Sequence, residues 1–316
     1  MFRRWKTNGL KVGDKIESQN EITKFCDFSL ITVIKTLKDL EAEGVIRRQV
    51  GKGSFLVKAP WSEAHHRIGF FYNRDIVGGG IFHNEFYTRL VISLEKGIVS
   101  DGHEFIMGSF THKSMPVVLW DRLDLVLLTG VTGQTELGSI RTTSSQVSVI
   151  DAVLEEPPVH SYRIDYRPAF DALFERYGNV SNRVLYLDTV LESSERAARL
   201  EAFQQASANS RELQDLRVVS VNQEDHVEDT SALEAAVTEF QPDLVCGYMH
   251  HSWHRLIPEL LSKPVRVYPF GLDTVRPGFV VDSDTWMSTI LPLIYEKLED
   301  RRAEAEIHNF PASFVP

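Results

Sequence analysis

The sequence predicts an α/β protein with two domains, a small one over residues 1–60 and a larger one over residues 61–316. Near the start of the chain, two short stretches with helical spacing of apolar residues precede a basic hairpin pattern. From Arg67 onward, short apolar runs alternate with amphipathic helical stretches, which is typical of parallel sheets wrapped by helices. Pro60 ends the hairpin pattern and a polar run follows it, so we place the domain boundary there.

The composition is that of an ordinary globular chain, with 43% hydrophobic and 25% charged residues. No run approaches the roughly eighteen consecutive apolar residues of a membrane span, and no secretory signal is recognisable at the start. Cys26 and Cys246 lie far apart in different predicted domains and are interpreted as buried thiols. We therefore expect a cytoplasmic protein that has no contact with a membrane.

The first domain is predicted to contain two helices with recognisable ends. Ser18 followed by Glu21 forms the S-x-x-E pattern of a capping box at the first helix. Ser29 or Asp27 can cap the second helix, and Gly44 ends it. Apolar positions at helical spacing are Ile22 and Phe25 in the first helix, and Ile31, Ile34, Leu37 and Leu40 in the second.

A hairpin with a basic ribbon follows the second helix. Residues 45–50 and 54–57 form the predicted strands, and Gly51-Lys52-Gly53 forms the turn. Two helices followed by such a hairpin predict a winged helix-turn-helix. Its ribbon cations suit phosphate contacts, and the early residues of the second helix suit contacts with base edges. The alternative is a small helical cap with a solvated hairpin. The ribbon cations are Arg47, Arg48, Lys52 and Lys58, and the helix residues are Ser29, Thr32 and Lys35.

The distribution of charge agrees with a nucleic-acid-binding first domain. The net charge of the chain is −10. Residues 1–60 carry twelve Lys and Arg against seven Asp and Glu, a balance of +5. The remaining residues carry twenty-two against thirty-seven, a balance of −15. A basic head on an acidic body is predicted to direct DNA to the head alone.

Three motifs in the first domain resemble the DNA-binding domain of the GntR family of bacterial repressors. They are Glu17-Ser18-Gln19, Ser29-Leu30-Ile31-Thr32-Val33, and the run from Arg47 to Val57 with its Gly51-Lys52-Gly53 turn. Leu30 stands where the family has Arg, and only Met1 to Leu10 precede the loop, so the family's first helix is nearly absent. Either the domain is abbreviated or the true start lies upstream. The resemblance implies binding to double-stranded DNA through Ser18, Ser29, Thr32, Lys35, Arg47, Arg48, Lys52 and Gly53.

In the larger domain, roughly ten predicted strands favour two subdomains, each a parallel sheet covered by helices. Ligands of such sheets bind beyond the carboxyl ends of the strands. The predicted strands, in order, are residues 68–72, 104–107, 123–128, 146–150, 183–187, 216–221, 244–246, 265–268 and 278–281. The predicted helices are residues 82–100, 168–177, 194–208, 231–240, 253–261 and 285–302.

Over residues 66–302 this order resembles the effector-binding core of the LacI family, which shares its fold with periplasmic binding proteins. Arg199, four residues before Phe203, matches the family's effector-binding arginine, and Gly271-Leu272-Asp273 matches a turn of the family. Asp151 matches the crossover position after the fourth strand, and Asp165 matches an acidic residue after the next short strand. The family's Asn-Asp pair is absent, and Tyr248-Met249-His250-His251 stands in its place.

The resemblance implies a carbohydrate-like effector bound between the two subdomains. Arg199 and Asp273 are expected to hold adjacent hydroxyls by charge-assisted hydrogen bonds, and Phe82, Phe86 and Trp253 to stack on a sugar face. The alternatives are structural charge pairs and core aromatic residues. The full expected effector set is Asn73, Arg74, Asp75, Phe82, Phe86, Asp151, Arg199, His250, Trp253 and Asp273.

Two other patterns have competing interpretations. His250 and His254 share a helix face at metal-ligand spacing, so a metal-dependent hydrolase using His250, His251 and His254 is an alternative function. Gly78-Gly79-Gly80 lacks the G-x-G-x-x-G pattern of a phosphate loop and is interpreted as a flexible loop beside the ligand. A solute-binding protein is a further alternative, which the basic head disfavours.

A GntR-type head on a LacI-type core is similar to the arabinose-repressor group of hybrid regulators. That similarity implies a homodimer, a palindromic operator and a sugar-like inducer. The sequence thus predicts a DNA-binding transcriptional regulator, most simply a repressor, with no catalytic residues, no cofactor and no metal.

Overall fold

The computed structural model describes residues 1–26, 28–49, 51–59, 66–76, 81, 85–154, 158–178, 181, 183–190, 192–209, 215–221, 230–250, 252–272, 277–299 and 304–316. The chain divides into two compact units, Met1–His65 with Asp101–His103, and His66–Ser100 with Glu104–Pro316. The boundary predicted at Pro60 falls outside the described residues. Within the described residues, no helix combines the length and the apolar character needed to cross a membrane.

The small unit contains the helices and the hairpin expected between Ser18 and Val57. Strands β1 and β2 are antiparallel, with Ile46 opposite Leu56, and Lys15 adds a bridge to Phe55. The segment before Leu10 does hold a short first helix, whose buried Trp5 donates a hydrogen bond from Nε1 to Glu17 at 2.6 Å. The elements are α1 Phe2–Thr7, α2 Gln19–Phe25, α3 Leu30–Ala42, β1 Ile46–Gln49 and β2 Gly53–Leu56.

The predicted helix ends of the small unit are confirmed. Ser18 caps α2, and a full capping box joins it to Glu21: the Glu21 backbone N–H donates to Ser18 Oγ and the Ser18 N–H to Glu21 Oε2. Ser29 caps α3 by accepting a hydrogen bond from the Thr32 N–H at 3.2 Å, while Asp27 lies outside the described residues. Gly44 follows α3 with φ +74°, a conformation that glycine adopts without steric cost.

The buried face of α3 contains Leu37 and Leu40 as predicted, but Val33 takes the place of Ile31 and Ile34. Ile31 is 80% exposed and Ile34 is half-buried, whereas Val33 is 2% exposed and packs with Leu37 and Leu40. Positions 33, 37 and 40 follow the same helical spacing as the predicted set, so periodicity alone did not separate the two faces. The apolar face of α3 that contains Val33 packs in a core with Trp5, Ile22 and Leu56.

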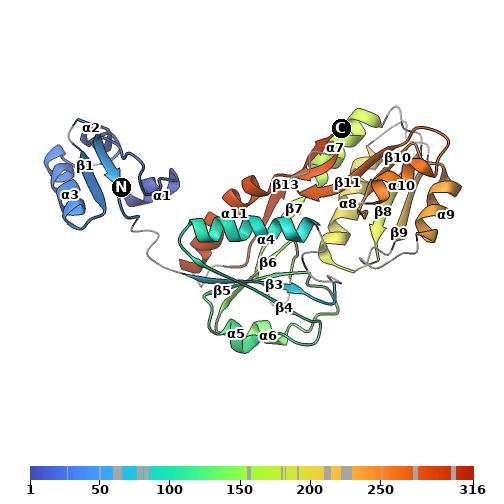
Figure 1. The fold of residues 1–316 in the computed structure, drawn as a ribbon, viewed down its shortest axis with the longest axis horizontal. Helices are drawn as coiled ribbons and strands as arrows, with labels where there is room; N and C mark the ends of the chain where they lie inside the picture. The colour runs from blue at the N-terminus through green and yellow to red at the C-terminus, as the bar shows by residue number, and fades with distance from the viewer. Residues whose placement is uncertain are drawn as a thin grey trace. The chain divides into compact units, whose positions relative to one another are not determined.

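The first sheet of the larger unit has six parallel strands in the order β13-β7-β6-β5-β3-β4. Its helices lie on both faces (Figure 1). The strands are β3 Arg67–Asn73, β4 Glu104–Phe110, β5 Leu125–Thr129, β6 Gln146–Ile150, β7 His160–Asp165 and β13 Ile307–Pro311, and the helices are α4 Glu85–Ser100, α5 Val117–Trp120, α6 Gly138–Thr142 and α11 Ser283–Glu299.

The second sheet has the order β14-β12-β11-β10-β8-β9, in which the short β14 alone is antiparallel to its neighbour. This confirms two parallel α/β subdomains within one unit. The strands are β8 Arg183–Thr189, β9 Asp215–Val221, β10 Leu244–Gly247, β11 Arg266–Leu272, β12 Gly278–Val281 and β14 Ser313–Val315, and the helices are α7 Arg167–Tyr177, α8 Ser194–Ala208, α9 Ser231–Phe240 and α10 Trp253–Glu259.

Alternation along each strand sends side chains to opposite faces of its sheet. Phe70 packs with α4 and α11, whereas Phe71 packs with Trp120 on the α5 side. In the second sheet Tyr186 faces α7 and α8, whereas Leu187 faces α9 and α10. Burial on both faces explains why these strands read as nearly continuous apolar runs.

Three crossings join the two sheets. The chain stays in the first sheet through β7, so the first crossing follows Asp165, and not Asp151 as predicted. It returns through α11 to β13, and crosses again at Ala312 to β14. The predictions also missed α5, α6, β13 and β14, because these short elements carry little periodic signal.

Substitution in the α3 core provides a test of the helix register. Leu37→Ala is expected to lower the free energy of unfolding of the small unit by about 2–5 kcal/mol, since it opens a cavity in a closed core. Ile31→Ala, on the exposed face, is the matched control and is expected to change it by less than about 0.5 kcal/mol. Hydrogen exchange of the α3 amides measures both effects. Equal losses of protection would contradict this register.

Candidate functional site

Four ionisable side chains meet beyond the carboxyl ends of strands in the larger unit. Asp151 directly follows β6, Arg163 lies in β7, and Glu195 and Arg199 lie one turn apart in α8, which follows β8. Electrostatic interactions join Asp151 to Arg199 and Arg163, and Glu195 to all three of the others. We call these four residues the charged cluster. Because β6 and β7 belong to the first sheet and α8 follows a strand of the second, the cluster spans both subdomains.

Arg199 is held among aromatic rings. Its guanidinium carbon lies 5.9 Å from the ring centroid of Tyr166, 5.8 Å from that of Tyr248 and 5.6 Å from that of Phe270. Its Nε donates to the Glu195 carbonyl oxygen at 3.2 Å. Burial alone would lower the pKa of Arg199, but the acidic neighbours Asp151 and Glu195, together with Tyr166, raise it above its usual value. The guanidinium therefore stays charged and fixed in place.

Asp151 occupies a strained backbone position with φ +51°, a region that aspartate tolerates better than most residues. Its N–H donates to the Tyr162 carbonyl oxygen at 2.9 Å, while its Oδ1 atom is buried and accepts no hydrogen bond from any described residue. Burial raises the pKa of its carboxyl group, against the opposing effect of Arg199 and Arg163.

Glu195 is the most buried member of the cluster, with 2% of its surface exposed. Arg163 Nε lies 3.3 Å from Glu195 Oε1, but neither carboxylate oxygen of Glu195 accepts a hydrogen bond from a described residue. Burial, followed by the charge of Asp151, raises its pKa to about 7, although Arg163 and Arg199 oppose that shift. The site therefore holds three buried carboxylate oxygens that lack hydrogen-bond donors.

Further contacts tie the first turn of α8 to the first sheet. Ser193 caps α8 by accepting a hydrogen bond from the Arg196 N–H at 3.1 Å. Ser194 Oγ accepts one from the Val153 N–H at 2.9 Å, which links the segment after β6 to the start of α8. Any change in the relation of the two sheets would consequently alter the charged cluster.

Tyrosine hydroxyls surround the cluster. Burial raises the pKa of Tyr87 and Tyr166, with further contributions from Asp151, and opposing ones from Arg199. Both phenols therefore remain protonated and can donate or accept hydrogen bonds. Together with Arg199 they supply polar groups in a largely aromatic setting, which suits a polyhydroxylated molecule.

The segment after β3 is built on its own hydrogen bonds. Asn73 is fully buried, donates from Nδ2 to the Gly130 carbonyl oxygen at 3.0 Å, and accepts from the Asp75 N–H at Oδ1. Asp75 Oδ2 accepts from the His112 N–H at 2.7 Å, and the side chain of Arg74 is exposed. The structure thus gives Asn73 and Asp75 a supporting role in this loop.

The predicted aromatic residues separate into different regions. Phe86 is half-buried beside Tyr87, with ring centroids 5.4 Å apart, near the charged cluster. Trp253 is 4% exposed and packs with Leu187 and Ile257 in the core on the other face of the second sheet. Trp253 lies on the apolar face of α10 that packs in this core, so its burial favours the core alternative, and its role as an effector contact stays a prediction. Phe82, Asp273 and the Gly78–Gly80 segment lie outside the described residues.

His250 lies just before α10, which begins at Trp253, and His250 Nδ1 accepts a hydrogen bond from the Ser252 N–H at 3.3 Å. His254 is half-buried in α10, and His251 lies outside the described residues. Among described residues, the potential metal-ligand group is His160, Glu306 and His308, and it includes neither His250 nor His254. Lys297 Nζ lies 2.9 Å from Glu306 Oε2, so the ammonium group of Lys297 already compensates the negative charge of Glu306.

Sequence reasoning missed Glu195, Arg163, Tyr87, Tyr166 and Tyr248. A glutamate two residues after an N-cap is a common helix-stabilising choice, so its pattern gave no sign of a site. The position of Tyr166 directly after Asp165, at the end of a strand, was the one usable signal.

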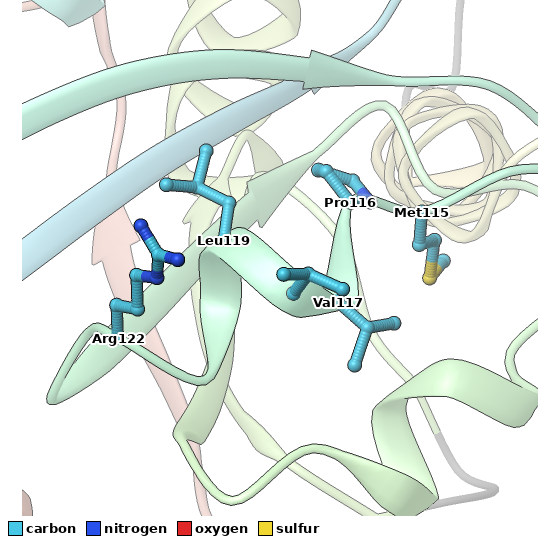
Figure 2. Close-up of a pocket in the computed structure, with 6 residues that line it drawn as sticks. Met115, Pro116, Val117, Leu119 and Arg122 are labelled. Carbon is cyan, nitrogen blue, oxygen red and sulfur yellow. The ribbon is translucent and has the colours of Figure 1, made fainter.

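The described pocket lies elsewhere, around α5. It is an open hollow of about 440 Å³ (Figure 2), lined by Met115, Pro116, Val117, Val118, Leu119 and Arg122. None of the predicted effector residues lines it. Five of its six lining residues are apolar and offer no polar side-chain atoms to sugar hydroxyls other than those of Arg122.

On the small unit, the side chains expected to contact DNA fall into two groups. Thr32, Lys35, Arg47, Lys52 and Gly53 are exposed. The hydroxyls of Ser18 and Ser29 are engaged in helix caps. Arg48 is partly buried, with Nε 3.4 Å from Glu41 Oε2, so its charge is directed to α3 and not to the ribbon surface.

No protein-family model matches the sequence, and no curated protein matches it. Solved structures do match.

The Cra transcriptional dual regulator from Pseudomonas putida, in complex with fructose 1-phosphate, has a TM-score of 0.60 and 17% identity, covering 79% of this chain and 98% of that one. A LacI family regulator from Enterococcus faecium with bound ribose has a TM-score of 0.59 and 14% identity, covering 79% and 97%. An ABC transporter solute binding protein from Bacillus halodurans with bound myo-inositol has a TM-score of 0.57 and 12% identity, covering 79% and 94%. The larger unit therefore has the two-subdomain fold of LacI-type regulators and periplasmic binding proteins.

The buried carboxyl of Glu195 predicts a pH-dependent stability. Folding raises the pKa of Glu195 from 4.5 to about 7. The contribution of Glu195 to the free energy of unfolding is therefore fully present below pH 4.5 and is lost as the pH rises through 7. Glu195→Gln is therefore expected to match the wild type at pH 5 and to be more stable at pH 8.5, by on the order of 3 kcal/mol. Thermal unfolding over a pH series measures the difference, with the exposed Glu259→Gln as control. A destabilised Glu195→Gln protein at pH 8.5 would contradict this account.

Proposed function

We propose that this protein is a DNA-binding transcriptional regulator whose small unit binds DNA and whose larger unit binds a sugar-like effector. The observation that carries the proposal is the charged cluster, because it joins two subdomains through groups that a polyhydroxylated ligand can satisfy. The fold supports it, since proteins of this fold include regulators with bound sugars. As a working model the small unit is a GntR-like winged helix-turn-helix, and the protein acts as a cytoplasmic repressor dimer on a palindromic operator.

The small unit has the parts that such a head requires. Helix α3 begins at a capped end and exposes Thr32 and Lys35, which would enter the major groove. The hairpin turn carries Lys52 between two glycines with positive φ, and Arg47 is exposed on β1. These cations suit phosphate contacts beside the recognition helix. Leu30, where the GntR pattern has Arg, is 45% exposed and would face the DNA without a charge.

The larger unit supplies the switch in this proposal. An effector that contacts Asp151 from one sheet and Arg199 from the other favours one arrangement of the two subdomains over the others. In a dimer, such a shift changes the spacing of two heads and hence their fit to two operator half-sites. Asn73, Arg74, Asp75, Phe82, Phe86, His250 and Asp273 remain proposed contributors to the effector site or its loops.

The direct test is fluorescence anisotropy of the full chain against DNA duplexes that tile its own upstream region, over a salt series. Tight, sequence-selective binding that weakens steeply with salt is expected. The absence of selective binding would overturn the regulator proposal.

Removal of ribbon cations should weaken DNA binding uniformly. Lys52→Ala and Arg47→Ala are each expected to lower affinity and to reduce the slope of log K against log salt by about one, because each removes one phosphate contact. Lys113→Ala, an exposed cation in the larger unit, is the matched control. Affinity that is unchanged by both ribbon substitutions would disprove the role of the hairpin.

The effector response should depend on Arg199. Arg199→Ala is expected to abolish the effect of the effector on operator affinity and to leave affinity without effector unchanged, since Arg199 lies in the larger unit. The exposed Arg255→Ala on α10 serves as control. Operator titrations with and without a sugar panel measure both. A preserved response would show that the effector binds elsewhere.

A further inference from the structure

Three buried acceptor atoms in the charged cluster accept no hydrogen bond from the described residues, although Arg163 Nε lies 3.3 Å from one of them as an ion-pair partner. They are Oε1 and Oε2 of Glu195 and Oδ1 of Asp151, none of which accepts a hydrogen bond from the described residues. A buried acceptor left without a hydrogen bond costs free energy, and the cost is larger when the acceptor is charged. The site is therefore complementary to a molecule that brings hydrogen-bond donors.

The charge of the cluster limits which molecule that is. Two carboxyl groups, Asp151 and Glu195, face two guanidinium groups, Arg163 and Arg199, so the four balance when all are ionised. Arg163 Nε lies 3.3 Å from Glu195 Oε1 as an ion pair but makes no hydrogen bond with a described residue. Arg199 Nε donates to the Glu195 carbonyl oxygen, and its guanidinium lies among the rings of Tyr166, Tyr248 and Phe270. A phosphate would add negative charge and acceptor atoms beside acceptors that already lack donors. Hydroxyl groups would add donors without charge.

We propose that Glu195, together with Asp151, is the specificity-determining wall of the effector site, which selects uncharged polyols and rejects phosphorylated sugars. This inference rests on the proposed effector site of the larger unit and names its ligand class. Two adjacent hydroxyls donate to the two oxygens of Glu195, and a further hydroxyl donates to Asp151 Oδ1. Arg199 donates to the ring or hydroxyl oxygens from the opposite side.

The arrangement also couples binding to pH. The groups that face Glu195 are Asp151 after β6, Arg163 in β7, Tyr166 before α7 and Arg199 in α8. Without ligand, burial keeps the pKa of Glu195 at about 7. Donated hydroxyls stabilise the ionised carboxylate and lower that pKa, so ligand binding releases a proton. Affinity is then expected to rise by up to about tenfold between pH 6 and pH 8.

The test is isothermal titration calorimetry of the full chain, without DNA, against matched pairs of ligands. The pairs are D-ribose with ribose 5-phosphate and D-fructose with fructose 1-phosphate, and myo-inositol is added as an uncharged cyclic polyol. At least one uncharged ligand is expected to bind at least ten times more tightly than its phosphorylated partner. Its affinity is expected to fall from pH 8 to pH 6.

Glu195→Gln separates a specificity role from a structural one. The substitution is expected to weaken binding of the uncharged ligand at pH 8 by at least tenfold and to remove its pH dependence, while the protein stays folded and is more stable at that pH. Glu259→Gln, on the exposed side of α10, is expected to change neither. Tighter binding of a phosphorylated partner, a response indifferent to Glu195→Gln, or a panel in which no uncharged ligand binds would each overturn the inference. Because no DNA is present, failure of operator binding would leave this result unaffected.

Discussion

Carboxylates are buried away from water where the two sheets of the larger unit meet. This constraint governs the charges and hydrogen bonds around the proposed effector site. Glu195 is almost fully buried, and Asp151 lies beside it in a strained conformation with a buried oxygen. Ionised groups are kept in such places only with opposite charges nearby, and Arg163 and Arg199 provide these. The compensation is incomplete, because the pKa of Glu195 stays well above that of an exposed glutamate. In the proposed function, a ligand that donates hydrogen bonds to these carboxylates gains binding free energy by completing their compensation.

The incomplete compensation of these carboxylates explains why ligand binding at the cluster could change the arrangement of the two sheets. Each sheet has an apolar core on one face, with Phe71 in the first sheet and Leu187 in the second, and a third core, with Phe70 and Tyr186, contains residues of both sheets. The charged contacts also cross between sheets, as do Ser194 with Val153 and Glu195 with Arg163. A ligand that changes how the two sheets relate would therefore act on these polar contacts and on the core that the two sheets share. In the proposed regulator, that change is what the DNA-binding unit would detect.

The small unit is organised in a different way. Its core of Trp5, Ile22, Val33, Leu37 and Leu56 fixes two capped helices and a hairpin, so exposed side chains on α3 and the hairpin are free to serve recognition. Arg48 shows that a cation in the sequence is not always a cation on the surface, since Glu41 holds its guanidinium. Lys52 and Arg47 form no ion pair with another described residue and are the stronger candidates for the proposed phosphate contacts.

Local patterns in the sequence determined most of the longer elements and their order, but not the short elements α5, α6, β13 and β14. Strand and helix alternation predicted two parallel sheets, and the capping residues Ser18 and Ser29 marked helix starts correctly, because caps and periodicity act over a few residues. The resemblance to the LacI family singled out Arg199 as a candidate effector contact, because it precedes Phe203 by four residues on the same helix. Glu195, Arg163 and Tyr87 were not singled out, because their importance arises only when β7, α4 and α8 are brought together. Likewise, the sequence around Trp253 fits a ligand pocket as well as an apolar core. Helical spacing in α3 fits a buried face with Ile31 as well as one with Val33. Only the packing of the sheets and of α3 decides which face of each helix is buried.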